Sequence, residues 1–239
     1  MKKIFYLFIV SVLVIGFSKL SFSESKNSKI IIGASPVPHA EILEKVKPIL
    51  AKEGVDLEIK VFTDYVLPNL ALADKSLDAN YFQHIPYLED FSKEKKLSLA
   101  SAGAIHFEPL GLYSSKIKSL KELKDGDKIA VPNDVTNEAR SLILLQDNGI
   151  LKLKDPKNLK STRKDIVSYK VKVDIVELEA AQIARSIDSV NAIVLNGNYA
   201  LEAKLSPDKA IVSEKNNSVA ARNYGNIIAV RKGDEKRKE

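Results

Sequence analysis

The sequence predicts an α/β protein, because segments with the periodicity of strands alternate with segments with the periodicity of helices. Residues 29–33 form an apolar run that ends in glycine, as a buried strand does. Residues 38–52 carry apolar side chains at helical spacing before Gly54 ends the helix. Residues 55–61 then alternate between apolar and charged side chains, which is the pattern of a half-buried strand. The chain therefore begins as a β-α-β series.

The same alternation continues along the chain. We expect further helices at 67–73, 86–95, 137–148, 180–187 and 199–205. We expect strands or extended segments at 79–82, 97–107, 110–114, 128–131, 171–178 and 192–195. The 150s and 160s are rich in Lys, Asp and Ser, and are predicted to form an excursion on the surface.

Two further segments, 104–113 and 224–231, are extended and apolar but are not bounded by a helix. They indicate strands that cross between two lobes. The tail at 231–239 is a run of charges, which is typical of a solvated or disordered segment.

The N-terminus predicts export. Lys2 and Lys3 precede an apolar run at 4–17 and a small, polar stretch at 18–23, which together have the features of a secretory signal peptide. The apolar run is shorter than the ~20 residues that span a membrane, although a retained anchor is the alternative. Removal of residues 1–23 would take away three lysines and leave a net charge of +3.

Composition excludes several classes of function. Basic and acidic residues alternate, and no Lys/Arg patch is interleaved with aromatic residues, so we expect no nucleic-acid partner. The chain has no cysteine, which excludes disulfides, thiolate metal sites and a cysteine nucleophile. His39 and His106 each lie two residues before a glutamate, but neither spacing is that of a metalloprotease. With no catalytic or nucleotide-binding motif, we expect neither an enzyme nor a cofactor nor a metal.

An aromatic segment is the first candidate for a binding site. Residues 80–88 (NYFQHIPYL) concentrate aromatic side chains and a histidine in a chain that has eight Tyr, eight Phe and three His in total. Such side chains pack in a core or line a pocket, and composition alone leaves both interpretations open.

Two polar positions are further candidates. Arg140 falls near the start of a helix that residues 133–137 could cap, where a guanidinium suits a ligand carboxylate. The alternative is an exposed arginine that pairs with Glu138 or water. Asn196 and Asn198 follow a strand and open a helix, where asparagine either binds a ligand or caps the turn.

Six collinear segments join these positions. They are GASPVPHAEIL (33–43), FTDYVLPNLAL (62–72), LDANYFQHIPYL (77–88), PND with NEAR (132–140), VELEAAQ (176–182) and NGNYAL (196–201). In this order they closely resemble the methionine-binding proteins of ABC importers, the NlpA/MetQ lipoprotein family. The resemblance extends from about residue 29 to 232.

The resemblance implies a two-lobed type II periplasmic-binding-protein fold, with a ligand cleft between the lobes. One lobe is expected at 29–112 with a return segment at 229–239, and the other at 113–228. Closure of the lobes on a methionine-like ligand would present a shape that an ABC permease and ATPase complex recognises. The family implies an exported, cell-envelope location, and we expect a monomer.

The resemblance also implies the site residues. Those of the first lobe would form a pocket for the thioether, and they are Tyr65, Phe82, His84 and Tyr87. From the second lobe, Arg140 would hold the ligand carboxylate, while Asn198 and Asn226 would bind its amino and carboxylate ends. The residues before Asn226 differ from the family's usual approach, so Asn223 is an alternative to it.

Two departures from the family leave alternatives open. Family members normally carry a lipidated cysteine after the signal peptide, so this chain is expected to be soluble in the periplasm or held by an uncleaved N-terminal segment. Family members also continue for roughly thirty residues as C-terminal helices, whereas this sequence ends after the 224–231 strand. A cell-surface interaction protein, or a truncated remnant without function, is therefore the alternative to a transport receptor.

Overall fold

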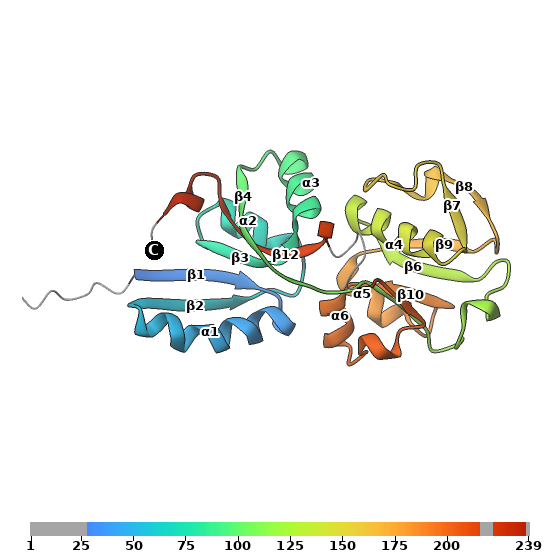
Figure 1. Cartoon of the computed structure of the whole chain (residues 1–239), viewed down its shortest axis with the longest axis horizontal. Helices are drawn as coiled ribbons and strands as arrows, with labels where there is room; N and C mark the ends of the chain where they lie inside the picture. Colours follow the sequence, from blue (N-terminus) through green and yellow to red (C-terminus); the bar gives the residue numbers. More distant parts are fainter. Residues whose placement is uncertain (1–27, 216–221, 238–239) are drawn as a thin grey trace, which may run out of the picture.

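The computed structural model describes residues 28–215 and 222–237. The predicted signal peptide lies outside the described residues. The described chain forms two α/β lobes that lie side by side along the long axis of the molecule (Figure 1).

The first lobe is built on a five-stranded sheet with the order β2-β1-β3-β12-β4. Its strands are β1 (Ser28–Ala34), β2 (Val55–Val61), β3 (Ala79–His84), β4 (Leu99–Phe107) and β12 (Gly225–Arg231). The strands β1, β2 and β3 pair in parallel, and β12 runs antiparallel between β3 and β4. Helix α1 (Glu41–Lys52) covers one face, and α2 (Leu67–Ala73) and α3 (Ile85–Lys95) cover the other (Figure 1).

The second lobe is built on a five-stranded sheet with the order β11-β5-β10-β6-β9. Its strands are β5 (Gly111–Tyr113), β6 (Lys128–Pro132), β9 (Asp174–Leu178), β10 (Ala192–Leu195) and β11 (Val212–Ser213). Helix α4 (Val135–Asp147) packs on one face. Helices α5 (Ala180–Ile183) and α6 (Gly197–Glu202) belong to a separate apolar cluster with β10.

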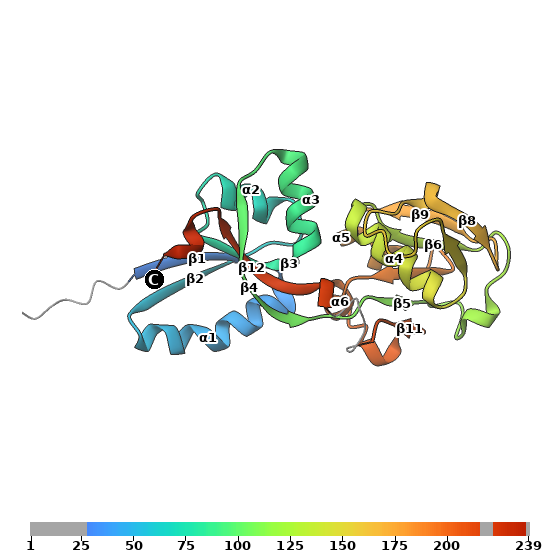
Figure 2. The same cartoon turned by 45° about the horizontal axis from the view of Figure 1, so that its top comes forward.

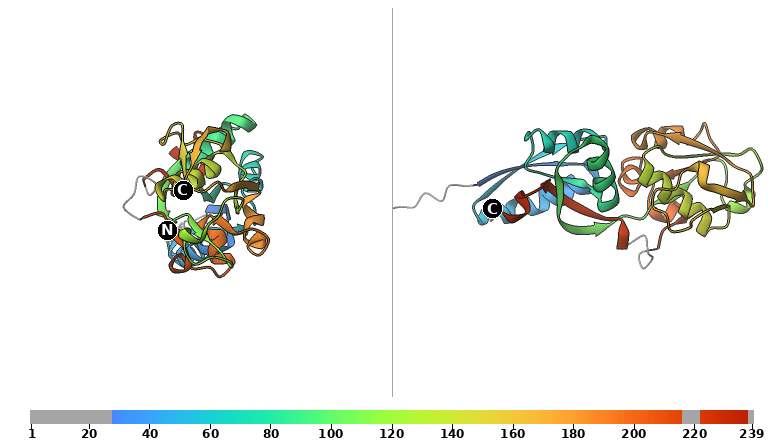
Figure 3. Two further views of the ribbon diagram at one scale, coloured as in Figure 1. Left: turned by 90° about the vertical axis from the view of Figure 1, so that its right-hand side faces the viewer. Right: turned by 90° about the horizontal axis from the view of Figure 1, so that it is seen from above.

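Two segments connect the lobes. The chain leaves the first sheet at the end of β4 and enters the second at β5, and it joins the first sheet again at β12. Figures 2 and 3 show β12 and the segment between β4 and β5 on the same side of the molecule. Because β12 pairs with both β3 and β4, the end of the first sheet that faces the second lobe carries residues from three strands. The predicted crossing at 104–113 is confirmed, because it runs from β4 of the first sheet to β5 of the second. The segment 224–231 is extended as predicted, but its strand pairs within the first sheet.

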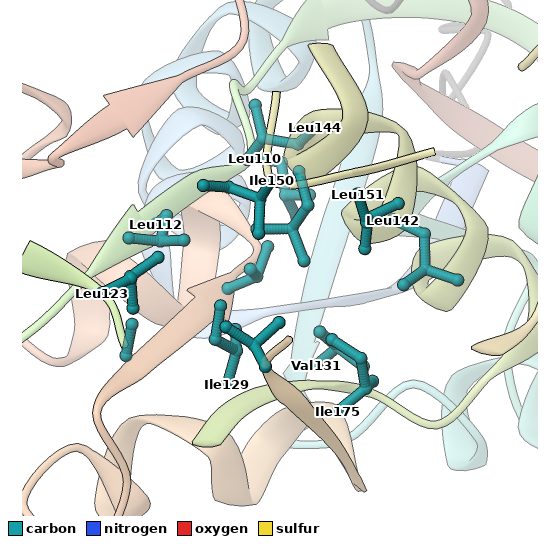
Figure 4. Close-up of a cluster of buried hydrophobic side chains, with 14 of the residues drawn as sticks. Leu110, Leu112, Leu123, Ile129, Val131, Leu142, Leu144, Ile150, Leu151 and Ile175 are labelled. Carbon is teal, nitrogen blue, oxygen red and sulfur yellow. The ribbon is translucent and has the colours of Figure 1, made fainter. Parts of the chain in front are cut away.

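The core of the second lobe is aliphatic. Leu142 and Leu145 of α4 belong to one apolar cluster with Ile129 and Val131 of β6, and all four side chains are fully buried. Figure 4 shows Leu142, Ile129 and Val131 in this cluster. Apolar surface of this kind contributes about 25 cal/mol per Å² removed from water. The predicted surface excursion at the 150s and 160s is only partly correct, because Leu151 and Leu153 join the same core.

Those two leucines lie on β7 (Leu151–Leu153), which pairs with β8 (Ile166–Tyr169) in a separate two-stranded sheet. Several of the other predicted elements appear with shifts at their ends. Helix α1 begins at Glu41 because Pro36–Ala40 form an irregular turn, and β9 begins at Asp174. Within residues 28–215 and 222–237, no helix combines the length and apolar character that crossing a membrane requires.

The charged tail is more ordered than its composition predicts. Arg231 donates to the backbone carbonyls of Leu72 and Leu77, and it pairs with Asp234 at 2.8 Å. These contacts attach the end of β12 to α2 and to the turn that precedes β3.

Gly33 is the position in β1 where the packing leaves no room for a side chain. A Cβ at this position would lie 2.6 Å from Leu77 Cδ1 and 3.0 Å from Phe62 Cε2. We expect Gly33→Ala to destabilise the protein by about 1–3 kcal/mol, because the neighbours must move in a packed core. Urea unfolding measures the change. Gly103→Ala in β4 is the matched control, since no described atom lies within 4 Å of its Cβ position, and equal losses in the two variants would contradict the packing argument.

Candidate functional site

A small cavity of about 20 Å³ lies where the two lobes meet. Its volume is that of a site for water, so a larger ligand would need the lining residues to move apart. It is lined by Tyr65, Phe82, Gln83, His84, Tyr87, Glu108, Asn137, Arg140, Asn196, Gly197, Asn198 and Asn226. The structure therefore brings together all seven residues that the resemblance assigned to the site. Asn226 lines this cavity, whereas Asn223 lines a different surface hollow beside α4.

The wall from the first lobe is aromatic. The Tyr65 ring lies 5.6 Å from the Phe82 ring and 5.8 Å from the Tyr87 ring, between centroids. The Tyr87 hydroxyl donates to the Tyr65 carbonyl at 3.0 Å, which fixes the two rings relative to each other. Burial raises the pKa of Tyr65 and of Tyr87, so both hydroxyls remain protonated. The aromatic segment predicted from the sequence is thus both core and pocket wall.

His84 caps α3 and reaches across to the second lobe. Its Nδ1 accepts from the Tyr87 backbone N–H at 3.2 Å, so the ring proton is on Nε2. Nε2 lies 3.2 Å from Asn137 Oδ1 and donates to it. Burial, and then the charge of Arg140, lower the pKa of His84 to about 3. His84 is therefore a neutral hydrogen-bond donor rather than a general acid or base near neutral pH.

The asparagines of the second lobe complete the polar side of the cavity. Asn137 Oδ1 also accepts from Asn196 Nδ2 at 2.9 Å. Asn198 Oδ1 accepts from the Tyr65 hydroxyl at 2.5 Å, which is a second hydrogen bond between the lobes. Asn196 Oδ1 is buried and has no hydrogen-bond partner among the described atoms. Since buried polar groups are normally satisfied, this oxygen is available to a ligand.

Arg140 is buried and held from several sides. Asp134 caps α4 by accepting from the Asn137 N–H at 3.0 Å, which places Arg140 on the second turn of the helix. Its Nε and Nη2 donate to the two oxygens of Glu214 at 2.9 and 2.6 Å, and the ring of Tyr224 lies 4.4 Å from Cζ. Among the described residues, none accepts from Nη1, which leaves these N–H groups for a ligand.

The alternative of an exposed Arg140 paired with Glu138 is therefore wrong. Arg140 is 4% exposed. Glu138 instead accepts from the Arg163 backbone N–H at 2.7 Å.

A second polar cluster borders the cavity at the crossing segments. His106 Nε2 lies 2.6 Å from Glu108 Oε1, and His39 Nε2 lies 3.4 Å from the same oxygen. The Tyr81 hydroxyl lies 2.5 Å from His106 Nδ1, and Asn226 Oδ1 lies 3.2 Å from His39 Nε2. Burial lowers the pKa of His39, so this ring is neutral.

The cluster of His39, His106 and Glu108 has a donor set that zinc accepts, and the donor atoms lie within 4.8 Å of one another. The separation of 2.6 Å between His106 Nε2 and Glu108 Oε1 is that of a direct hydrogen bond. In this structure His106 is thus hydrogen-bonded to Glu108, and His39 is hydrogen-bonded to Asn226.

Sequence reasoning missed Glu108 and Glu214 as members of the site. Glu108 could have been noticed, because it lies within the predicted crossing segment at 104–113, next to any cleft between the lobes. Glu214 carried no such signal. It lies 74 positions from Arg140 in a polar stretch, and only the folded chain brings the two together.

Comparisons with known proteins agree with this architecture. A family model described as NlpA lipoprotein matches residues 30–239. A methionine-binding lipoprotein MetQ of Bacillus subtilis is 41% identical over 220 residues, which cover 89% of this chain and 78% of that protein. A D-methionine-binding lipoprotein MetQ of Salmonella typhi is 45% identical, over 84% of this chain and 73% of that protein.

Solved structures extend the likeness to three dimensions. A crystal structure of a putative lipoprotein from Ruminococcus gnavus matches with a TM-score of 0.86 and 56% identity, over 88% of this chain and 87% of that chain. A nutrient-binding protein from Burkholderia cenocepacia, bound to methionine, matches with a TM-score of 0.83 and 43% identity, over 87% of each chain. At these identities and TM-scores, both solved structures share the fold of this chain over nearly all of the described residues.

The buried, neutral state of His84 predicts a dependence of stability on pH. The pKa in the folded protein, about 3, is below the ordinary value of 6.5. As the pH falls through 6.5, the unfolded chain binds a proton that the folded chain does not, so the free energy of unfolding decreases. In His84→Gln this contribution is absent, while an amide N–H can still donate to Asn137.

The stability advantage of the wild type over His84→Gln should therefore shrink by about 1–2 kcal/mol between pH 7 and pH 5. Urea unfolding of both proteins at several pH values measures it. The titration of His39 is common to the two proteins and cancels in the difference. Parallel curves for the two proteins would show that His84 titrates normally in the fold.

Proposed function

The chain belongs to the NlpA lipoprotein family, and we propose that it is the substrate-binding protein of an ABC importer for methionine or a close relative. The family is one of binding lipoproteins, and several relatives are named for binding methionine. The observation that carries the proposal is the cavity itself. It combines an aromatic wall on the first lobe with a guanidinium and asparagine amides on the second.

Methionine has complementary chemistry at its two ends. Its thioether is apolar and polarizable, and contacts between sulfur and aromatic rings contribute roughly 0.3–1.5 kcal/mol each. We assign the thioether to Tyr65, Phe82, His84 and Tyr87, and the carboxylate to Arg140. Asn198 and Asn226 then bind the polar end of the ligand. A ligand in this orientation touches both lobes at once.

Contact with both lobes is the means by which a ligand would drive closure. Hydrogen bonds from Tyr65 to Asn198 and from His84 to Asn137 already join the lobes in this structure. A ligand that binds the closed form better shifts the population toward it. The closed protein would deliver its ligand to a membrane permease with an associated ATPase. We propose that the protein acts as a monomer. We also place it outside the cytoplasm, in the cell envelope, as the lipoprotein names of its relatives suggest.

Binding of L-methionine is the direct test. At a ligand concentration one hundred times the dissociation constant, the protein should be stabilised by about 2.7 kcal/mol. Thermal unfolding with and without ligand measures this, with L-alanine as the control that has the same polar end and no thioether. An unchanged melting curve across methionine, its sulfoxide and its dipeptides would refute the proposal. It would favour a surface interaction protein or a remnant that does not close.

The role of Arg140 requires a double variant. Arg140→Ala alone would leave Glu214 buried without a countercharge and would destabilise the fold by several kcal/mol. Arg140→Ala combined with Glu214→Gln removes both charges, so we expect a folded protein whose affinity for methionine falls by about 100-fold or more. Isothermal titration calorimetry measures the affinity. Arg185→Ala, on the surface away from the cavity, is the control, and near-normal affinity in the double variant would exclude Arg140 as the carboxylate ligand.

A further inference from the structure

The segment at 152–172 of the second lobe carries an excess of positive charge. It contains eight Lys or Arg residues and two Asp residues, a net charge of +6. Both aspartates accept from backbone N–H groups within their own loops. The chain after residue 23 has a net charge of +3, so the residues outside this segment sum to −3. The alternation of basic and acidic residues that holds along most of the chain therefore fails in this region.

Most of these cations have no partner within the protein. Lys160 Nζ lies 2.5 Å from Asp90 Oδ1, and Arg163 Nε lies 3.3 Å from Glu177 Oε1. Among the described residues, no carboxylate forms an ion pair with the other six, which are Lys152, Lys154, Lys157, Lys164, Lys170 and Lys172. Their charges are thus available to an anionic partner.

The sheet of β7 and β8 gathers part of this charge on one exposed face. Lys152 stands between the two buried leucines of β7, so the alternation of a strand directs its side chain outward. Lys154 and Lys170 follow the ends of the two strands and are also exposed. The register of the strands shifts beside Lys152, where Val167 has no paired residue. Such a bulge redirects a side chain, and Val167 is 57% exposed.

An apolar side chain held outward among unpaired lysines suits an anionic membrane surface. Ammonium groups are attracted to acidic headgroups, and each Lys close to such a surface strengthens binding by about fivefold. Valine gains by entering the boundary between headgroups and acyl chains. A soluble polyanion would satisfy the lysines but would offer nothing apolar to Val167.

We propose that this basic face, defined by Lys152, Lys154, Val167 and Lys170, docks the second lobe on an anionic lipid surface. The inference goes beyond the proposed function, which concerns the cavity between the lobes. Strand β1, where the described chain begins, and the sheet of β7 and β8 lie at opposite ends of the molecule (Figure 1). The contact is therefore separate from any that the N-terminus makes.

The test measures sedimentation with phosphatidylcholine vesicles that contain either no phosphatidylglycerol or about 30% of it. It uses the chain from residue 24, because the apolar run at 4–17 would itself bind lipid and both lobes begin after it. The protein should bind the anionic vesicles and not the neutral ones. Binding should fall by tenfold or more between about 0.01 M and about 0.1 M salt, since the Debye length shortens from about 30 Å to about 10 Å.

A triple variant tests the face itself. Lys152→Gln, Lys154→Gln and Lys170→Gln together should weaken binding to anionic vesicles by about 100-fold. The matched control removes the same charge from exposed positions of α1 and α3, by Lys45→Gln, Lys52→Gln and Lys93→Gln. The control should bind within about threefold of the wild type, because its lysines lie on the first lobe. Equal losses in the two triple variants, both with normal melting temperatures, would overturn the inference.

Val167→Ser separates a lipid surface from a soluble polyanion. This variant should bind anionic vesicles about threefold or more weakly, and it should bind polyphosphate as the wild type does. Unchanged vesicle binding in the variant would overturn the lipid contact. A wild type that binds polyphosphate but not the vesicles would overturn it as well. Neither result bears on the proposed function, because methionine binding is measured without lipid.

Discussion

The buried ion pair between Arg140 and Glu214 is the interaction on which the rest of the site depends. Nη2 of Arg140 also donates to the Glu108 carbonyl at 2.9 Å, and Glu214 Oε2 accepts from the Leu110 N–H at 2.8 Å. The pair therefore fixes helix α4 against the crossing segment that joins the lobes. Loss of one member of a buried pair of this kind strongly destabilises the folded protein, because the other charge is left buried without a partner.

The lining of the cavity has three chemically different regions. Glu214 occupies two nitrogens of Arg140. Glu108 lines the same cavity and is held by His106. The aromatic rings of the first lobe form the third region, which has no charge of its own. On the proposed function, the carboxylate of methionine meets Arg140 and its thioether meets the aromatic rings.

Local sequence patterns predicted most of the elements, because strand and helix periodicities are properties of neighbouring residues. The helix at 67–73 and the strand at 192–195 appear with the predicted bounds. The same reasoning missed β7, since its two leucines stand among polar residues and gain their partners only in the fold. It also missed Glu214, because an ion pair across 74 positions leaves no local pattern. The resemblance supplied residues that periodicity could not, yet it gave no role to Glu108.

On the proposed function, closure of the lobes and ligand binding are linked. The hydrogen bonds between the lobes exchange contacts with water for contacts within the protein, and each contributes only about 0.5–1.5 kcal/mol net. A ligand that reaches both Arg140 and the aromatic wall would add its contacts to these in the closed state alone. Because a ligand shifts an equilibrium only by its differential affinity for the two states, the population of the closed form would then depend on a ligand that is long enough to touch both lobes.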